Sequence, residues 1–156
     1  MTPAMNAPEL THLCDLNVDV AAPIEMGEAL GRRRRIIPIV GGTVSGERIK
    51  GDILNLGADW QTIFNDTIAE LDTRYALRTH DGAIIEIRNF GYRVGPPEIV
   101  ARLARGEDID PALYYMRTHP RFETGDPRYA WLNHTICVGT GMRRANSVHV
   151  SVFEVG

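Results

Sequence analysis

Two arginines lie inside predicted strands close to a tyrosine: Arg74 beside Tyr75, and Arg117 two residues after Tyr115. A buried guanidinium is costly unless it is paired, so each arginine should meet either a carboxylate of the fold or an acidic ligand. In the second case, the fixed cations would stabilise the negative oxygen of a carboxylate or of an enolate formed during a reaction. The carboxylates available for structural ion pairs are Asp72, Glu86 and Glu123.

Asp59 is a further carboxylate of interest because it follows a Gly-Ala turn and precedes Trp60. A turn aspartate that caps the next segment, with the tryptophan in the core, explains this pair without any function. Alternatively, the carboxylate lies at a cavity rim beside the indole, and desolvation raises its pKa toward the range that general acids and bases need. In an enzyme, Asp59 or Glu123 would move a proton, while Arg117 and Arg74 hold the anionic oxygen.

Aromatic and amide side chains supply candidate contacts for a flat, oxygenated ligand. Trp131 and Asn133 share one face of a strand predicted over residues 129–137, and such a face belongs either to the core or to a cavity wall. The arginine run at residues 32–35 is either a solvated loop that discourages edge pairing or the source of one guanidinium at the cavity mouth. The predicted ligand contacts are Arg34, Trp60, Arg74, Tyr75, Tyr115, Trp131 and Asn133.

Motifs of several large function classes are absent from the sequence. The five histidines have no cysteine or carboxylate partner at zinc-type spacing, so we expect no metal ion and no other cofactor. The sequence has no P-loop, no dinucleotide fingerprint and no serine-hydrolase motif, and we interpret the Gly-Thr-Gly segment at residues 139–141 as a hairpin turn. We expect Cys14 and Cys137 to be buried, reduced thiols.

Length and charge favour a single globular domain. The 156 residues suffice for one core, and the net charge of −3 argues against a general nucleic-acid binder. The chain has no run of about 18 apolar residues, and residues 1–9 lack the features of a signal peptide, so we expect no membrane partner and a cytoplasmic location. We interpret residues 1–9 as a flexible N-terminal tail and residues 10–156 as the domain.

Apolar residues alternate with polar ones over much of the chain, which predicts strands. Residues 14–20 and 148–153 alternate in this way, and residues 71–89 form the clearest hairpin. A three-residue loop with Gly82 left-handed pairs Leu77 with Ile85 and leaves one nearly clean apolar face. A two-residue Asp-Gly loop leaves both faces mixed, so we prefer the three-residue loop.

Two further segments are less regular strand candidates. Residues 36–40 are apolar but contain Pro38, which favours a sheet edge or a strand end. Gly41-Gly42 then indicate a turn, and residues 49–56 are a further candidate strand.

One short helix interrupts the strands. Pro96-Pro97 precede residues 98–105 and Gly106 follows them, which is the asymmetry typical of helix ends. Many strands and one short helix in a connection predict an all-β fold, a single-domain antiparallel β-barrel.

Several blocks of residues form a recognisable pattern in a fixed order. They are Gly31-Arg32-Arg33-Arg34 with Ile37-Pro38-Ile39 and Gly41-Gly42, Gly57-Ala58-Asp59-Trp60, Leu71-Asp72-Thr73-Arg74-Tyr75 with Asp81-Gly82-Ala83, Met116-Arg117-Thr118, Phe122-Glu123-Thr124, Tyr129-Ala130-Trp131-Leu132-Asn133, and Val152-Phe153-Glu154-Val155. Over residues 10–155 the chain resembles domain-of-unknown-function family 3237, also called uncharacterised protein family 0311. The resemblance implies a small β-barrel similar to the calycins. Fungal relatives associated with polyketide pathways imply cofactor-free ring chemistry.

Together these features predict a barrel that holds a small organic ligand, either acidic or an oxygenated aromatic compound of polyketide type. As an enzyme, the protein would be a cofactor-independent isomerase, cyclase or dehydratase that works through an enolate-like state. The alternative is a non-catalytic carrier or sensor barrel that uses the same cavity. A third alternative is a structural module with a filled interior that acts through a homo-oligomer interface.

Overall fold

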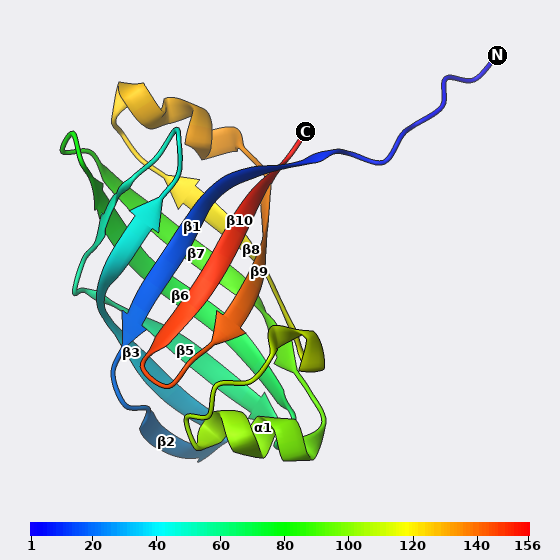
Figure 1. Ribbon diagram of the computed structural model, residues 1–156, viewed down its shortest axis with the longest axis vertical. Helices are drawn as coiled ribbons and strands as arrows, with labels where there is room; N and C mark the ends of the chain where they lie inside the picture. The colour runs from blue at the N-terminus through cyan, green and yellow to red at the C-terminus, as the bar shows by residue number, and fades with distance from the viewer.

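The chain folds into a closed barrel of eight antiparallel strands in the computed structural model, which describes residues 1–156 (Figure 1). Around the barrel, β1 pairs with β10, and the series continues through β9, β8 and β7 to β6. Strands β4 and β5 both link β6 to β3, which closes the barrel onto β1, and β2 extends the sheet beside β3. The strands are β1 (Leu10–Val20), β2 (Ile24–Ala29), β3 (Arg32–Ser45), β4 (Gly51–Ile53), β5 (Gly57–Phe64), β6 (Ile68–Thr79), β7 (Ile84–Val94), β8 (Tyr115–Glu123), β9 (Cys137–Arg143) and β10 (Ser147–Val155).

The predicted all-β antiparallel barrel is confirmed, whereas its similarity to the calycins stays a prediction. The helix predicted over residues 98–105 is α1 (Pro97–Ala104), and Gly106 beyond it adopts a φ of 80°. The other helical elements are the 3-10 turn η1 (Pro111–Leu113) and the 3-10 segment η2 (Pro127–His134). In Figure 1, α1 and η2 lie at opposite ends of the barrel.

Alternation along the strands sends apolar side chains into the barrel. The main core contains 21 buried residues, among them Leu16 of β1 and Val152 of β10. A second cluster of seven buried residues lies at the α1 end, where Leu103 of α1 packs with Ile63 and Met116 of the barrel wall. The connection between β7 and β8 therefore closes that end of the barrel.

The hairpin of β6 and β7 has the register that the apolar pattern predicts. Leu77 pairs with Ile85, and Tyr75 pairs with Ile87. The backbone N–H of Thr79 donates to the Ala83 carbonyl at 2.9 Å, and Gly82 has a φ of 93°. The three-residue loop is therefore confirmed, and the charged face of the hairpin points to solvent.

The strand predicted over residues 129–137 is wrong, because residues 127–134 form η2. The side chain of Asp126 accepts a hydrogen bond from the backbone N–H of Arg128 at 2.9 Å, and Pro127 occupies the first helical position. Tyr129 and Leu132 are the buried residues, three positions apart, which is the repeat of a 3-10 helix and not of a strand. The two-residue spacing of Tyr129, Trp131 and Asn133 concealed this repeat.

Of the two positions expected for Pro38, a sheet edge or a strand end, the strand end is wrong, because Pro38 lies within β3. On one side Pro38 pairs with Ala58 of β5. On the other side it falls in the gap between β1 and β2, where the Ala21 N–H donates to its carbonyl at 3.0 Å. A proline is tolerated at this point because no strand there needs its missing N–H.

Two glycine segments predicted as turns lie within strands. Gly41-Gly42 belong to β3, and the Gly-Thr-Gly segment at residues 139–141 belongs to β9. The candidate strand at residues 49–56 shrinks to β4. Gly42, Gly139 and Gly141 mark close approaches to a neighbouring strand and not a reversal of the chain.

Residues 1–9 precede β1, are exposed and have no regular secondary structure. Their flexibility and the division of the chain into a tail and a domain stay predictions. No helix of this chain has the length and apolar character needed to cross a bilayer.

Gly42→Ala tests the closure of the barrel. Gly42 has a φ of 133°, and a Cβ there would overlap the Asn17 carbonyl group of β1. We expect a loss of about 2–4 kcal/mol in the free energy of unfolding, from backbone strain and from separation of the two strands. Chemical denaturation measures the loss. Gly125→Ala is the control, because no atom lies within 4 Å of a Cβ at that position. Equal stabilities of the two variants would contradict this account of closure.

Candidate functional site

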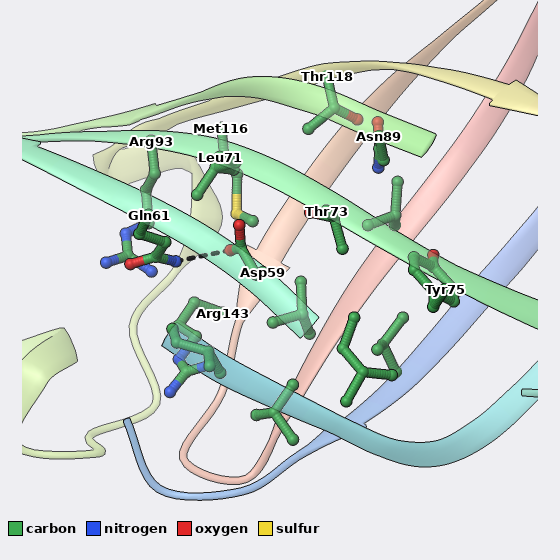
Figure 2. Close-up of a pocket in the computed structure, with 16 residues that line it drawn as sticks. Asp59, Gln61, Leu71, Thr73, Tyr75, Asn89, Arg93, Met116, Thr118 and Arg143 are labelled. Atoms are coloured by element: carbon green, nitrogen blue, oxygen red, sulfur yellow. Dashed lines mark hydrogen bonds between the residues drawn. The ribbon is translucent and has the colours of Figure 1, made fainter. Parts of the chain in front are cut away.

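A narrow cavity lies inside the barrel (Figure 2), and its 16 lining residues come from eight strands, β1, β3 and β5 to β10. It forms part of about 510 Å³ of atom-free space that includes its opening to solvent. The centres of water-sized molecules can occupy about 40 Å³ of it, which is room for about three waters. A larger ligand therefore requires flexible lining side chains, such as Met116 and Arg143, to move.

Asp59 points into this cavity from β5 and is held by two hydrogen bonds. Gln61 Nε2 donates to Oδ2 at 2.7 Å, and the backbone N–H of Asp72 donates to Oδ1 at 2.9 Å. Arg35 Nε in turn donates to Gln61 Oε1 at 2.8 Å. Burial raises the pKa of Asp59, while the two hydrogen bonds and the charges of Arg93 and Arg35 partly oppose this rise. The carboxylate is thus fixed in orientation and desolvated.

Three arginines lie near this carboxylate: Arg93 of β7 and Arg143 of β9 line the cavity, and Arg35 of β3 lies behind Gln61. None of them lies within ion-pair distance of a carboxylate. Arg93 is only 8% exposed. Burial lowers the pKa of Arg93 to about 10, and the charges of Arg35 and Arg143 act in the same direction. The cavity therefore has an excess of positive charge.

Neutral polar side chains line another part of the cavity. Tyr75 is 3% exposed, Asn89 is 5% exposed and Thr118 is 6% exposed. Burial raises the pKa of Tyr75, with smaller contributions from Cys14 and Asp59. The phenol therefore stays protonated at neutral pH and can donate a hydrogen bond to a ligand oxygen.

The family model described as "Protein of unknown function (DUF3237)" matches residues 8–155. The chain belongs to this family. Among its relatives, a UPF0311 protein of Rhodopseudomonas palustris is 43% identical and covers 99% of both chains. A UPF0311 protein of Clostridium acetobutylicum is 38% identical and covers 90% of this chain and 89% of its own. The resemblance inferred from the sequence blocks is confirmed.

Solved structures share the DUF3237 barrel. A conserved protein of unknown function from Rhodopseudomonas palustris has a TM-score of 0.89 at 42% identity and covers 100% of both chains. A β-barrel-like protein from Acinetobacter baumannii has a TM-score of 0.86 at 41% identity, covering 99% of this chain and 100% of that one. An enzyme from Penicillium herquei has a TM-score of 0.74 at 17% identity over 100% of both chains, which shows a common fold alone.

Only Asp59 and Tyr75 of the predicted site residues line the cavity. Their sequence neighbours Trp60 and Arg74 point outward, since successive side chains of a strand face opposite sides. Trp60 is 45% exposed, and Arg74 Nη2 forms an ion pair with Glu86 at 2.9 Å on the outer surface. Of the two explanations for Arg74, an ion pair of the fold or a contact with an acidic ligand, its position therefore agrees with the ion pair.

The candidates from β8 also lie outside the cavity. Tyr115 is 54% exposed, and the guanidinium of Arg117 lies 5.4 Å from the centre of its ring. Arg117 lines a separate surface groove, and Glu123 is exposed near the end of the strand. The structure therefore does not bring Arg117 and Glu123 together with Asp59.

The remaining three candidates have structural neighbours outside the cavity. The guanidinium of Arg48 lies 3.8 Å from the ring centre of Trp131. Asn133 accepts from the Thr124 N–H at 2.8 Å and donates to its carbonyl at 3.0 Å, which fixes the loop before η2. Arg34 is half-buried on β3, next to the inward-facing Arg35.

Sequence reasoning missed Gln61, Arg93 and Arg143, although a signal was present for each. The inward phase of β7 runs through Ile85, Ile87 and Asn89 to Arg93 in steps of two. The same step along β9 leads from Cys137 to Arg143, and along β5 it leads from Asp59 to Gln61. Extending each apolar phase to the end of its strand would have found all three.

No group of three or more His, Cys, Asp or Glu side chains is arranged to hold a metal ion. The expectation that the protein needs no metal or other cofactor stays a prediction. Cys14 and Cys137 are buried and free, and burial raises the pKa of both thiols, to about 12 and about 11.

Asp59→Asn tests the desolvation of the cavity carboxylate. The pKa of Asp59 is raised above its ordinary value of 3.8 in the folded protein. At a pH between 3.8 and this raised pKa, the folded protein therefore keeps a proton on Asp59 that the unfolded chain has released. The free energy of unfolding therefore falls as the pH rises through that interval, and the amide removes this contribution. We expect the stability of the wild type relative to Asp59→Asn to decline with rising pH.

Thermal unfolding between about pH 4 and pH 8 measures this difference. Asp52→Asn is the matched control, because Asp52 is exposed on β4. A stability difference between the wild type and Asp59→Asn that is flat, or that grows with pH, would contradict a raised pKa.

Proposed function

We propose that the barrel interior binds a small organic acid or an enolisable carbonyl compound and transfers a proton through Asp59 without a cofactor. The observation that carries this proposal is the pairing of buried Arg93 with half-buried Arg143 beside Asp59 in the cavity, with no carboxylate of the fold in an ion pair with either arginine. A buried cation without a partner destabilises a fold, so an anionic ligand is the natural counter-charge.

Electrostatics favour an anionic oxygen at the arginines. Arg93 and Arg143 outnumber Asp59, the single carboxylate in the cavity lining, and the apolar lining strengthens their field because water is scarce. The planar guanidinium groups donate several hydrogen bonds in a geometry that matches a carboxylate or an enolate. The same groups that bind a substrate acid would thus stabilise a negative oxygen that forms during the reaction.

Asp59 suits the role of proton acceptor. Its raised pKa brings the carboxylate closer to the basicity that proton abstraction from carbon requires. In the proposed step, Asp59 takes a proton from the carbon next to a carbonyl group. The C–H electron pair becomes the C=C bond of an enolate, the carbonyl π electrons move onto oxygen, and the proton returns at another position or after elimination. Isomerases, cyclases and dehydratases of this kind share that enolate.

The comparisons support the proposal only at the level of the fold. A chain with the same barrel, from Penicillium herquei, is described as an enzyme, so such a barrel is compatible with catalysis. The bacterial relatives carry no assigned activity in their names. The roles of Asp59, Arg93 and Arg143 therefore rest on the cavity of this chain.

A carrier or sensor is the second candidate, and the hydrogen bonds of Asp59 favour it. Both carboxylate oxygens accept a hydrogen bond, from Gln61 and from the backbone of Asp72, and such bonds stabilise the ionised form. An aspartate that stays ionised and fixed would orient Arg93 without exchanging a proton with the ligand. Binding without turnover separates this function from the first.

Arg93→Met tests the anion site by two opposite effects. Removal of an unpaired buried charge should raise the melting temperature by about 3 °C or more, since 1 kcal/mol corresponds to about 2–4 °C in a domain of this size. The same change should weaken the binding of an aromatic acid such as cinnamate by about 30-fold or more. Calorimetry measures both quantities.

Arg88→Met is the control for this variant. Arg88 lies on the same strand but faces outward, where it forms an ion pair with Glu86 at 3.1 Å. An exposed pair contributes less than about 1 kcal/mol, so acid binding should be unchanged. A marked loss of stability in Arg93→Met, with binding intact, would reject the anion site.

Deuterium exchange tests proton transfer. In D₂O the wild type should accelerate loss of the methylene proton signal of phenylpyruvate, and Asp59→Asn should slow this exchange by about 100-fold or more. Proton NMR follows the signal. Glu123→Gln is the control, because Glu123 is exposed on the outer surface. Binding of phenylpyruvate without accelerated exchange would favour the carrier instead.

A further inference from the structure

Two side chains in the cavity wall have fully buried polar atoms with no hydrogen-bond partner. They are Oδ1 of Asn89 on β7 and Oγ1 of Thr118 on β8, and both atoms are buried. Asn89 is 5% exposed, Thr118 is 6% exposed, and both residues line the cavity (Figure 2). Buried polar atoms in folded proteins are almost always paired, so two unpaired atoms in one cavity need an explanation.

Glycines on both neighbouring strands make room for the Thr118 side chain. Thr118 pairs with Gly91 on one neighbouring strand and with Gly139 on the other. A Cβ at Gly139 would lie 2.6 Å from Thr118 Oγ1, and a Cβ at Gly91 would lie 2.8 Å from its Cγ2. Neither of these two glycines supplies a side chain that could pair with the hydroxyl, so Oγ1 is packed against both neighbouring strands without a hydrogen-bond partner.

The unpaired polar atoms of Asn89 and Thr118 make the folded protein less stable than apolar side chains of the same shape would. Valine has the shape of threonine and leucine has nearly that of asparagine, and either would fill the wall without an unsatisfied polar atom. We infer that Asn89 and Thr118 form a second subsite, which binds a hydroxyl group at the end of the ligand away from Arg93. This inference rests on the proposed function, because it identifies the substrate class as hydroxylated acids.

The spacing of the two subsites defines the shape of such an acid. Asn89 and Arg93 lie on the same face of β7, four residues apart, so their Cα atoms are separated by about 13 Å. Leu71, Met116 and Val150 supply apolar lining to the same cavity. The ligand is therefore elongated, with an anionic end, an apolar middle and a hydroxyl group at the far end.

A hydroxyl group suits both partners. It donates to Asn89 Oδ1 and accepts from the Thr118 hydroxyl, or it takes the reverse roles if the amide is rotated. A second carboxylate would not suit this end, because neither Asn89 nor Thr118 carries a charge. The subsite thus discriminates between a hydroxylated acid and its unsubstituted parent.

The test compares three probes by calorimetry on the full chain. Cinnamate carries the acid alone, 4-hydroxycinnamate carries both groups, and 4-ethylphenol carries the hydroxyl alone. The wild type should bind 4-hydroxycinnamate about tenfold more tightly than cinnamate, as expected for one buried hydrogen bond. Thr118→Val and Asn89→Leu should each remove this preference by weakening the binding of 4-hydroxycinnamate relative to cinnamate, and should keep or raise the melting temperature.

Thr140→Val is the matched control, because Thr140 lies on β9 beside this region and is exposed. It should retain the tenfold preference. If cinnamate and 4-hydroxycinnamate bind equally to the wild type, and both need Arg93, the hydroxyl subsite is rejected and the anion site stands. If only the hydroxylated probes bind, in a manner that depends on Thr118, the subsite stands and the acid site fails.

A lower melting temperature in both Thr118→Val and Asn89→Leu, with the preference for 4-hydroxycinnamate intact, would overturn the inference. The two polar side chains would then serve the fold, through ordered water. Failure of the wild type to bind any of the three probes would also overturn it.

Discussion

The constraint on which the site depends is the cost of a buried guanidinium group. Arg93 points into a narrow barrel whose walls exclude most water, and no carboxylate of the fold neutralises it. Asp59 is close enough to affect its pKa but is already bound to Gln61 and to the backbone of Asp72. The interior therefore carries an unpaired positive charge before any ligand binds. This charge lowers the stability of the fold, and an anion that pairs with it would recover that free energy on binding.

The barrel positions this charge by dividing its interior into two kinds of wall. Strands β1, β3 and β10 contribute only valine and isoleucine to the cavity, whereas the polar lining comes from β5, β6, β7, β8 and β9. A ligand would therefore form hydrogen bonds with the polar wall on one side and pack its apolar face against the valines and isoleucines on the other. Closure of β3 onto β1 at Gly42 joins the apolar strands β3, β1 and β10 into one wall, which begins beside Asp59 because Ile37 of β3 pairs with Asp59 of β5.

Local patterns predicted most of the fold, because a barrel imposes strict alternation on its strands. The register of β6 with β7 followed from the apolar face alone. The η2 segment was not predicted. Asp126 and Pro127 begin a 3-10 helix there, but the apparent alternation of the residues that follow suggested a strand. For the site, Asp59 and Tyr75 were found, but Trp60 was chosen beside Asp59 although adjacent residues face opposite ways. The arginine cluster required three-dimensional closure, because its members come from β3, β7 and β9.

The most direct test of the central claim is a crystal structure with 4-bromocinnamate, in which anomalous scattering locates the bromine. The account predicts bromine inside the barrel, with the carboxylate accepting hydrogen bonds from Arg93 or Arg143. A parallel crystal with neutral 4-bromostyrene should show no ordered bromine at that position. Bromine found only on the outer surface, or a carboxylate directed at the valines of β1 and β10, would contradict the account.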